Sequence, residues 1–325
     1  MAHDDALDGP PSYGYGPPPG SDGGWPSGAP PYREAPTHPP YREPPTPPPY
    51  PGASAVPPYL GATPGPMAAR RRLPVRPSPV FGGLLVVALA AGAYLWTVGD
   101  VVSTPMRVAI FVFVAVGWTV SLCVHEFAHA AAAWKGGDRS VEGRGYLTLD
   151  PRRYMDRQLS IVLPIIIVLI GGIGLPGGAV MIDRRLIPGR GMRSLVSAAG
   201  PLTNLAFALA LAAPLEFHWF AGHAALLTAL AFLAFLEMAA TVLNALPIPG
   251  LDGFGVLAPW LPDETVASLM PISQYAFFGL FILLFYSAQA NQSFFRFCFR
   301  MTSAIGVPPS AAQDGMLLFR FWQHH

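Results

Sequence analysis

The five residues from His125 to His129, read as HEFAH, combine the residue types and the spacing of a zinc site. Two histidines at positions i and i+4 of a helix point the same way and can share one zinc ion. The glutamate between them, Glu126, is then free to act as a general base toward water. This pattern is typical of zinc-dependent peptide hydrolysis, so His125 and His129 are candidate ligands and Glu126 is the candidate catalytic base.

A catalytic zinc needs three protein ligands and an open position for water, and Asp252 is the candidate for the third ligand. It lies in the sequence PIPGLDG, Pro247 to Gly253, where prolines and glycines can break helical geometry and aim a carboxylate sideways. For LDG taken by itself, an ordinary turn is the better interpretation. The ligand role is favoured if Asp252 reaches the same membrane depth as HEFAH.

Asn204, in the sequence SAAGPLTN, is a polar residue early in an apolar segment. At helical spacing it shares a small, polar face with Ser197, Gly200 and Pro201, which permits the close approach of another helix or of a substrate. A catalytic role and a hydrogen bond between helices would both satisfy its amide. Asn204 is therefore a candidate catalytic residue with a structural alternative.

Glu237 shares one helical face with Thr241 and Asn244, which follow it by four and seven residues, and this face must look into the bundle. A buried carboxylate at this place could hold a ligand histidine in its orientation. It could also be a paired structural acid, and we favour that interpretation.

The composition places these residues in a membrane. Of the 325 residues, 52% are hydrophobic and 12% are charged, whereas roughly a quarter are charged in soluble domains. The run from Arg107 to Trp134 is apolar for longer than a soluble helix needs, and ionisable residues at membrane depth are usually functional. We expect a lipid bilayer as partner and no nucleic acid. The first thirty residues contain no apolar core, so we expect no cleaved signal peptide.

Residues 1–69 hold more than half of the 38 prolines, mixed with Gly, Tyr and Ser. Such a segment cannot bury a core, so we expect a disordered tail biased toward polyproline II. PPSY at Pro10–Tyr13 and PPPY at Pro47–Tyr50 have the form of PPxY ligands for aromatic-grooved modules, which would give the tail a protein partner. A spacer of biased composition is the alternative that we favour.

Six apolar segments follow the tail, and a helix needs about 20 apolar residues to span the hydrocarbon core. Most of the six qualify. The exception is Leu159–Leu175, which is short and is interrupted by Pro164 and by glycines. The six segments are Val80–Val98, Val108–Trp134, Leu159–Leu175, Leu195–Leu215, Ala224–Leu246 and Ile272–Tyr286.

Arginines in the short loops set the expected orientation, because positively charged loops stay in the cytosol. Four arginines between Arg70 and Arg76 precede the first span, so we expect the N-terminus in the cytosol. Basic loops flank Leu159–Leu175 on both sides, so this segment is expected to be re-entrant. About five helices then span the cell membrane, and Asp252 returns to the cytosolic depth of HEFAH.

We therefore expect an all-α polytopic membrane protein in three parts: a tail at 1–69, a protease domain at 70–287 and a C-terminal tail at 288–325. The arginines of the C-terminal tail would lie outside the cell if Ile272–Tyr286 crosses the membrane. Its aromatic runs favour an interfacial position instead.

Two segments beside the re-entrant piece have strand-like sequences. Gly172–Ile182 is rich in glycine and in β-type residues, and Gly145–Asp150 alternates with a period of two. We expect the two to pair as a β-hairpin. An unpaired edge there could bind an extended substrate by adding a strand, and a hairpin without that role is the alternative.

With HEFAH, AGPLTN and NALPIPGLDG in this order on separate apolar segments, the chain resembles the site-2 protease family of intramembrane zinc metalloproteases. The similarity covers residues Val80 to Tyr286. It implies that the two histidines of HEFAH and Asp252 bind zinc, and that the glutamate of HEFAH activates water. It also implies that Asn204 helps to engage the substrate backbone.

The same resemblance implies a core of three helices with the site facing the cytosol, which agrees with the orientation expected from the arginines. PDZ and CBS domains, which other members carry, do not fit here. The interval from His129 to Gly200 is too short for a PDZ domain, and only about forty residues follow Tyr286.

The expected function is zinc-dependent cleavage of membrane-spanning segments of single-pass proteins, near the cytosolic face of the cell membrane. One alternative is a membrane zinc protease that cuts soluble peptides and uses Glu237 or Glu264 as its third ligand. A second is a metal-binding scaffold or transporter without protease activity. Glu126 argues against the second, because a pure ligand site has no use for that carboxylate.

Overall fold

The structure, a computed structural model, describes residues 72–99, 102–154, 180–217 and 222–322. The chain divides into two units, Met1–Met67 and Ala68–His325, and every described residue belongs to the second unit. The tail expected over residues 1–69 and the re-entrant segment expected over Leu159–Leu175 both lie outside the described residues.

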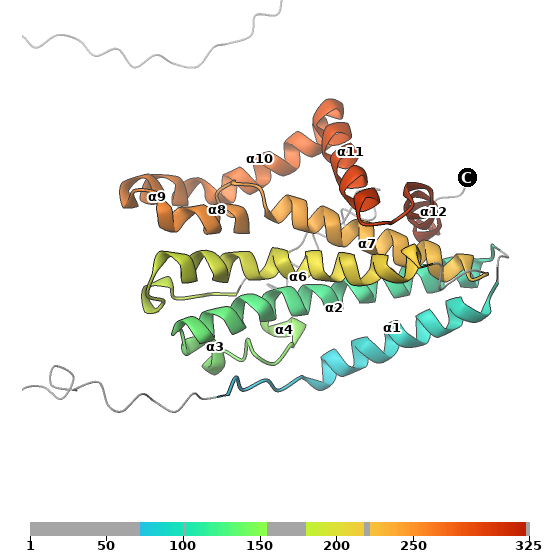
Figure 1. The fold of residues 1–325 in the computed structure, drawn as a ribbon, viewed down its shortest axis with the longest axis horizontal. Coiled ribbons are helices and arrows are strands. Elements are labelled where there is room, and N and C mark those ends of the chain that lie inside the picture. The colour runs from blue at the N-terminus through green and yellow to red at the C-terminus, as the bar shows by residue number, and fades with distance from the viewer. Residues whose placement is uncertain (1–71, 100–101, 155–179, 218–221, 323–325) are drawn as a thin grey trace, which may run out of the picture. The chain divides into compact units, whose positions relative to one another are not determined.

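Four helices form the body of the second unit and lie side by side (Figure 1). They are α1 Pro79–Thr97, α2 Thr104–Gly136, α6 Arg190–Glu216 and α7 Ala224–Asn244. Each is long and apolar enough to cross a membrane, and even α1 extends about 28 Å at 1.5 Å per residue. The chain is therefore a multi-pass membrane protein, with long helices at four of the six expected apolar segments.

Shorter helices connect and cover these four. Within the described ranges they are α3 Ser140–Gly143, α4 Pro151–Tyr154, η1 Arg184–Leu186, α8 Asp252–Leu257, η2 Ala258–Trp260, α9 Asp263–Leu269, η3 Met270–Ile272, α10 Ser273–Tyr286, α11 Ala288–Ala304 and α12 Pro309–Phe319. At about 21 Å, α10 is shorter than the hydrocarbon core of about 30 Å. A fifth span at this place therefore stays a prediction.

Local sequence signals fix where the first two long helices begin. The hydroxyl of Ser78 accepts a hydrogen bond from the backbone N–H of Phe81, and Ser103 caps α2 in the same way through Met106. Each cap is followed by a proline in the first turn, where the missing N–H costs nothing. α2 ends at Gly136, and its C-cap is Gly137, whose φ of +123° suits glycine.

α7 lies at the centre of the packed core and contacts α2, α6, α11 and α12. Phe235 and Met238 of α7 are fully buried, and the small α6 residue Ala212 belongs to the same buried core as Phe235. The C-terminal helices belong to the same core, because Cys298 of α11 and Phe319 of α12 are buried in it. Residues 288–319 are thus packed on the bundle.

Gly145–Asp150 does not form the expected strand, and no strand occurs in the ranges that the structure describes. The backbone turns after α3, with φ of +77° at Gly145 and +56° at Leu149, outside the strand region. The neighbours Tyr146 and Leu147 are both buried, so the side chains do not alternate between two faces. The backbone of this stretch pairs with the segment before α1: Arg76 N–H to the Leu147 carbonyl (3.3 Å) and Ser78 N–H to the Thr148 carbonyl (2.8 Å).

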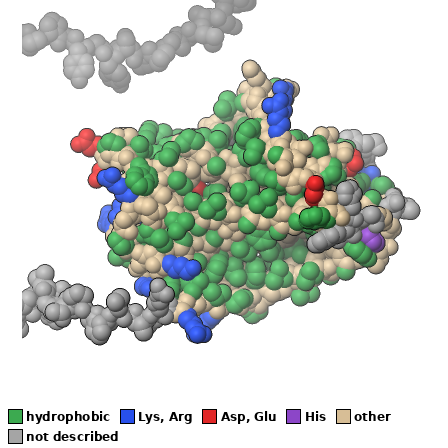
Figure 2. Space-filling model, viewed as in Figure 1, with side chains coloured by type: hydrophobic (Ala, Val, Ile, Leu, Met, Phe, Trp, Pro, Cys, Tyr) green, Lys and Arg blue, Asp and Glu red, His purple; other side chains and the backbone are tan. Residues whose placement is uncertain are grey.

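Hydrophobic side chains cover most of the face of the four-helix body seen in Figure 2. On α1, Val86 and Leu89 are 66% and 72% exposed. Apolar surface of this extent is expected to contact lipid. Lys and Arg side chains gather at the end of the body where α6 begins.

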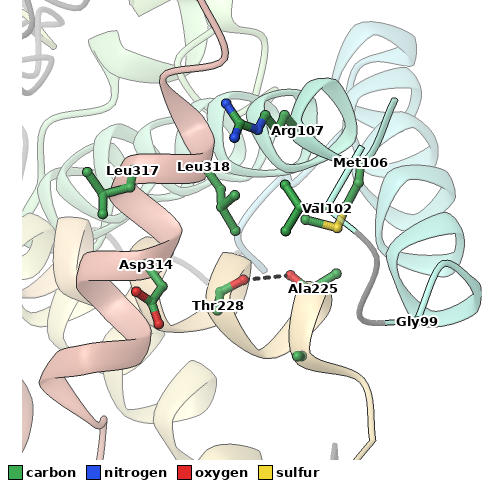
Figure 3. Close-up of a pocket in the computed structure, with 10 residues that line it drawn as sticks. Gly99, Val102, Met106, Arg107, Ala225, Thr228, Asp314, Leu317 and Leu318 are labelled. Carbon is green, nitrogen blue, oxygen red and sulfur yellow. Dashed lines mark hydrogen bonds between the residues drawn. The ribbon is translucent and has the colours of Figure 1, made fainter. Parts of the chain in front are cut away.

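A cavity of about 420 Å³ lies at the opposite end, beside the start of α2. Met106 and Arg107 of α2, Thr228 of α7 and Leu318 of α12 are among the residues that line it (Figure 3). His125 lies about 28 Å further along α2 than Met106. The cavity is therefore separate from HEFAH.

Candidate metal centre

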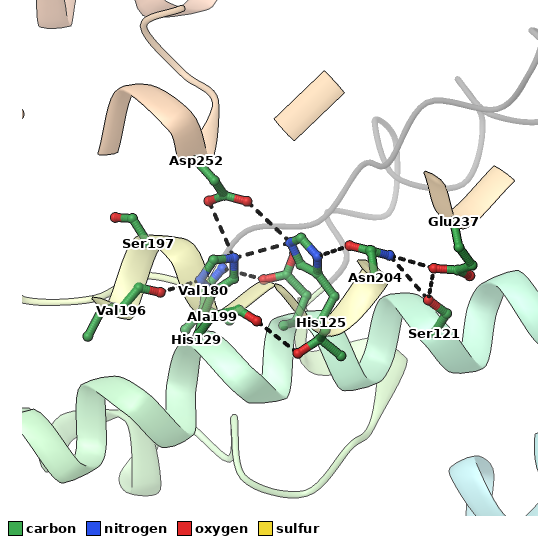
Figure 4. Close-up of polar contacts among 12 residues, drawn as sticks. Ser121, His125, His129, Val180, Val196, Ser197, Ala199, Asn204, Glu237 and Asp252 are labelled. Atoms are coloured by element: carbon green, nitrogen blue, oxygen red, sulfur yellow. Dashed lines mark hydrogen bonds and ion pairs between the residues drawn. The ribbon is translucent and has the colours of Figure 1, made fainter. Parts of the chain in front are cut away.

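The candidate ligands come from two elements that are far apart in the sequence. His125 and His129 lie one turn apart on α2 and are buried, and Asp252 is the first residue of α8. The two Nε2 atoms are 3.1 Å apart, and the carboxylate oxygens of Asp252 lie 3.4 Å and 3.3 Å from them (Figure 4). The structure thus brings together the three residues that the sequence indicated as ligands.

Hydrogen bonds at the far side of each ring determine which nitrogen faces Asp252. Nδ1 of His129 lies 2.7 Å from the backbone carbonyl of Val196, and Nδ1 of His125 contacts Oδ1 of Asn204. Both partners are oxygens that only accept hydrogen bonds, so each Nδ1 carries the proton of a neutral ring. Each Nε2 then has a lone pair directed at the space next to Asp252.

This donor set fits zinc. Two imidazole nitrogens and one carboxylate oxygen leave a position open for water, as catalytic zinc sites require. The two Nε2 atoms, 3.1 Å apart, are close enough to share one ion held at about 2.0–2.1 Å, and each has an oxygen of Asp252 within 3.3–3.4 Å. Burial by itself would raise the pKa of Asp252, but its hydrogen bonds to His125 and His129 outweigh burial and hold that pKa below its usual range.

Gly200 of α6 lets the helix pass close to the two histidines. A Cβ atom at this position would overlap Nε2 of His129 and the ring of His125. Glycine is therefore required here by the close approach of α6 to α2 rather than by its backbone angles. The small, polar face that the sequence indicated on this helix is the face directed at the metal centre.

Glu126 lies between the two histidines on α2 and is 4% exposed. Its Oε2 accepts a hydrogen bond of 3.1 Å from the backbone N–H of Val180. No described residue forms an ion pair with this carboxylate. The side chain is thus held beside the centre without serving as one of the grouped ligands.

A cluster of buried polar side chains lies behind His125 and joins three helices. The amide nitrogen of Asn204 donates to Oε2 of Glu237 (2.7 Å) and to the hydroxyl of Ser121 (3.3 Å), and Ser121 donates to the same Oε2 (2.6 Å). Sequence reasoning did not single out Ser121. Its position four residues before His125, on the same face of α2, is the signal that could have found it.

Arg184 of η1 is a second residue near the centre that sequence reasoning did not single out. One of its guanidinium nitrogens donates to the hydroxyl of Ser197 (3.1 Å), on the same small face of α6 as Gly200. Burial lowers the pKa of Arg184, and the negative charge of Asp252 opposes that effect. Several arginines share this loop, and nothing in the sequence distinguishes this one from the others.

The two glutamates considered as alternative third ligands lie elsewhere. Glu264 is an exposed residue of α9, and Glu237 is engaged with Asn204 and Ser121. Among the described residues, the group that could hold a metal ion consists of His125, His129 and Asp252. The geometry therefore favours Asp252 over either glutamate.

Comparison with known proteins gives relatives that are named as zinc metalloproteases. The chain is 46% identical over 252 residues to a Mycobacterium tuberculosis protein named as a zinc metalloprotease, Rip2, a match that covers 78% of this chain and 96% of that protein. Rip2 of Mycolicibacterium smegmatis is 43% identical, with coverage of 77% and 96%. YwhC of Bacillus subtilis, also named as a zinc metalloprotease, is 30% identical, with coverage of 51% and 76%. No protein-family model matches the chain, and no solved structure matches it significantly.

The relatives and the grouped ligands agree on the chemistry. Zinc is the cofactor of this protein, and it is a zinc-dependent protease. Site-2 proteases are the family to which the order of HEFAH, AGPLTN and NALPIPGLDG pointed. Because the identity to Rip2 runs over almost the whole length of that relative, this chain belongs to the site-2 protease family of zinc metalloproteases.

Proposed function

We propose that this zinc protease cleaves membrane-spanning segments of single-pass membrane proteins, inside the membrane and near its cytosolic face. The observation that carries the proposal is that two members of the ligand group, His125 and His129, lie within α2, a helix long and apolar enough to span a bilayer, and that Asp252 of α8 reaches them there. His125 lies about 17 Å before the end of α2, a helix of about 50 Å. A peptide bond cut beside it lies at membrane depth.

The distribution of arginines supports a site that faces the cytosol. Lys135 is in the last turn of α2, and Arg139 and Arg144 follow directly. Arg184 and Arg185 precede α6 at the same end of the body. Short loops rich in Lys and Arg stay on the cytosolic side of a membrane, so the end nearer to HEFAH is the cytosolic end.

The residues divide the chemistry between holding the metal and moving a proton. Bound zinc supplies a Lewis acid that polarises the peptide carbonyl and lowers the pKa of water. His125, His129 and Asp252 hold it. Glu126 takes the proton of the attacking water and returns it to the leaving amine. The backbone N–H of Val180 holds the Glu126 carboxylate in place for both transfers.

A membrane-spanning substrate must unwind before it can be cut. The carbonyl groups of a helix are engaged in its own hydrogen bonds and are shielded by its side chains. We therefore expect cleavage to favour substrate segments that contain glycine, proline or other helix-weakening residues close to the cytosolic face.

The test compares the membrane proteomes of cells that carry wild-type protein or Glu126→Gln. We expect single-pass membrane fragments to accumulate in the variant, because the substitution removes the general base and keeps the three ligands. Zinc content of the purified variant is the control and is expected to equal that of wild type. Undiminished cleavage of a natural substrate by Glu126→Gln would refute the mechanism. Cleavage of soluble peptides alone by the wild type would refute the substrate class.

A further inference from the structure

The cluster of Ser121, Asn204 and Glu237 is an unusual arrangement for the interior of an apolar bundle. The three side chains are 1%, 4% and 0% exposed, and they come from α2, α6 and α7. A carboxylate at membrane depth is costly, and such residues are retained where they serve a function. The mechanism described above uses none of the three for the reaction itself.

The two ends of the Asn204 side chain have different neighbours. Its amide nitrogen faces the Oε2 atom of Glu237, and its amide oxygen faces Nδ1 of His125 (Figure 4). An asparagine amide can be turned by half a rotation, which exchanges donor and acceptor. A carboxylate oxygen that accepts two hydrogen bonds selects the orientation with nitrogen toward Glu237 and oxygen toward His125.

We infer that Glu237 is a positioning residue that acts through Asn204 to fix the proton of His125 on Nδ1 and thereby keeps Nε2 available to the metal. With the amide reversed, an N–H group would face Nδ1 and the ring proton would move to Nε2, where it blocks the lone pair that binds zinc. The inference rests on the proposed binding of zinc by His125. In this inference, Asn204 transmits the effect of Glu237 to the ligand histidine that it contacts.

Ser121 supports the same arrangement from α2. Its hydroxyl donates to Oε2 of Glu237 and accepts from the Asn204 amide, so both groups of the pair are held by one side chain. Oε1 of Glu237 has no hydrogen-bond partner among the described residues. The Oε2 atom therefore makes all the hydrogen bonds that the structure gives this carboxylate, and they all lead toward His125.

The test measures zinc affinity of the full-length protein in detergent by competition with a chromogenic chelator. Loss of an outer partner of a ligand histidine weakens metal binding by about 10–100-fold. We expect a loss in this range for Glu237→Leu and a smaller loss for Glu237→Gln, which keeps an acceptor oxygen and removes the preference for one amide orientation. The visible spectrum of bound Co²⁺ should change in both variants, because the orientation of the His125 ring is no longer fixed.

A double-variant comparison tests whether Glu237 acts through Asn204. Once Asn204→Ala has removed the contact with His125, a further Glu237→Leu should weaken zinc binding no more. Losses that multiply would show that Glu237 acts by another route and would overturn the inference. So would zinc affinity that stays unchanged in Glu237→Leu and Glu237→Gln.

Thr228→Val is the matched control for removal of a buried polar group from α7. Thr228 is 8% exposed, and its hydroxyl bonds to the carbonyl of Ala225, far from the ligands. We expect wild-type zinc affinity in this variant. Thermal unfolding of each metal-free variant separates stability from metal binding, and a lowered unfolding temperature with normal zinc affinity in the Glu237 variants would leave a structural role only. Zinc binding that survives His125→Ala would instead overturn the ligand assignment itself.

Discussion

At the scale of single residues, the metal centre assigns different tasks to side chains of similar chemistry. Asp252, Glu126 and Glu237 are three carboxylates near the same two histidines. Asp252 faces both Nε2 atoms, Glu126 is held by a backbone N–H, and Glu237 accepts hydrogen bonds from a hydroxyl and an amide group. Their surroundings, rather than their identity, are the basis on which we propose Asp252 as ligand, Glu126 as base and Glu237 as positioning residue.

Replacement of Asp252 should therefore affect zinc more than replacement of Glu126. We expect Asp252→Ala to weaken zinc binding by more than about 100-fold, because loss of a direct ligand costs more than loss of an outer partner. Glu126→Gln should retain zinc and lose proteolysis. Zinc content after dialysis against a weak chelator measures the difference, and equal retention of zinc by both variants would contradict the assignment.

At the scale of elements, long apolar runs were predictable and their contacts were not. α1, α2, α6 and α7 begin and end within a few residues of the expected segments, apart from an earlier start of α6 at Arg190, because such runs are the strongest signal in a membrane sequence. Helical periodicity also identified the face of α6 that contains Asn204. It could not identify the partner of that residue, because the spacing on one helix does not determine which side chain of another helix lies opposite.

The strand expected at Gly145–Asp150 was wrong for a related reason. A period of two over six residues is a weak signal, because a segment of turns, such as the one after α3, can have the same alternating sequence as a strand. The depth of Asp252 is a different case. It was inferred from the order of segments, and the structure gives a stronger argument, because the carboxylate contacts both histidines.

The close approach of α6 to α2 gives a prediction at this scale. Gly200→Ala places a methyl group against both ligand histidines. We expect it to cost about 1–3 kcal/mol of stability, as overpacking does, and to reduce zinc binding. Thermal unfolding and zinc titration measure the two effects.

Gly191→Ala is the control on the same helix, since nothing lies within 4 Å of a Cβ atom there. Alanine should raise stability by up to about 1 kcal/mol at that position, because it restricts the unfolded chain. If the two substitutions gave the same result, the contact between Gly200 and the histidines would not be the reason for glycine.

At the scale of the whole molecule, the two ends of the four-helix body differ in their charge and in the sites that lie near them. One end has the arginine-rich loops and lies nearer to the zinc ligands, and the other has the cavity between α2, α7 and α12. The native cysteines, Cys123 and Cys298, are both buried. Introduced cysteines can therefore report the orientation without removal of the native ones.

We expect Val102→Cys to react with a membrane-impermeant maleimide in intact cells, because Val102 is 56% exposed at the end assigned to the outside. Arg185→Cys, exposed at the arginine-rich end, should react only after the membrane is permeabilised. Gel-shift of the labelled protein reads out both. The reverse pattern would place the N-terminus and the zinc site on the outer side of the membrane.

The separation of the ligands along the chain has a consequence for biosynthesis. His129 and Asp252 are about 120 residues apart, which a ribosome needs about 6–24 s to translate at 5–20 residues per second. During that interval we expect HEFAH to lie in the membrane without Asp252, its proposed third ligand. We therefore expect the nascent protease to remain inactive beside other newly inserted helices until α7 and α8 have been made.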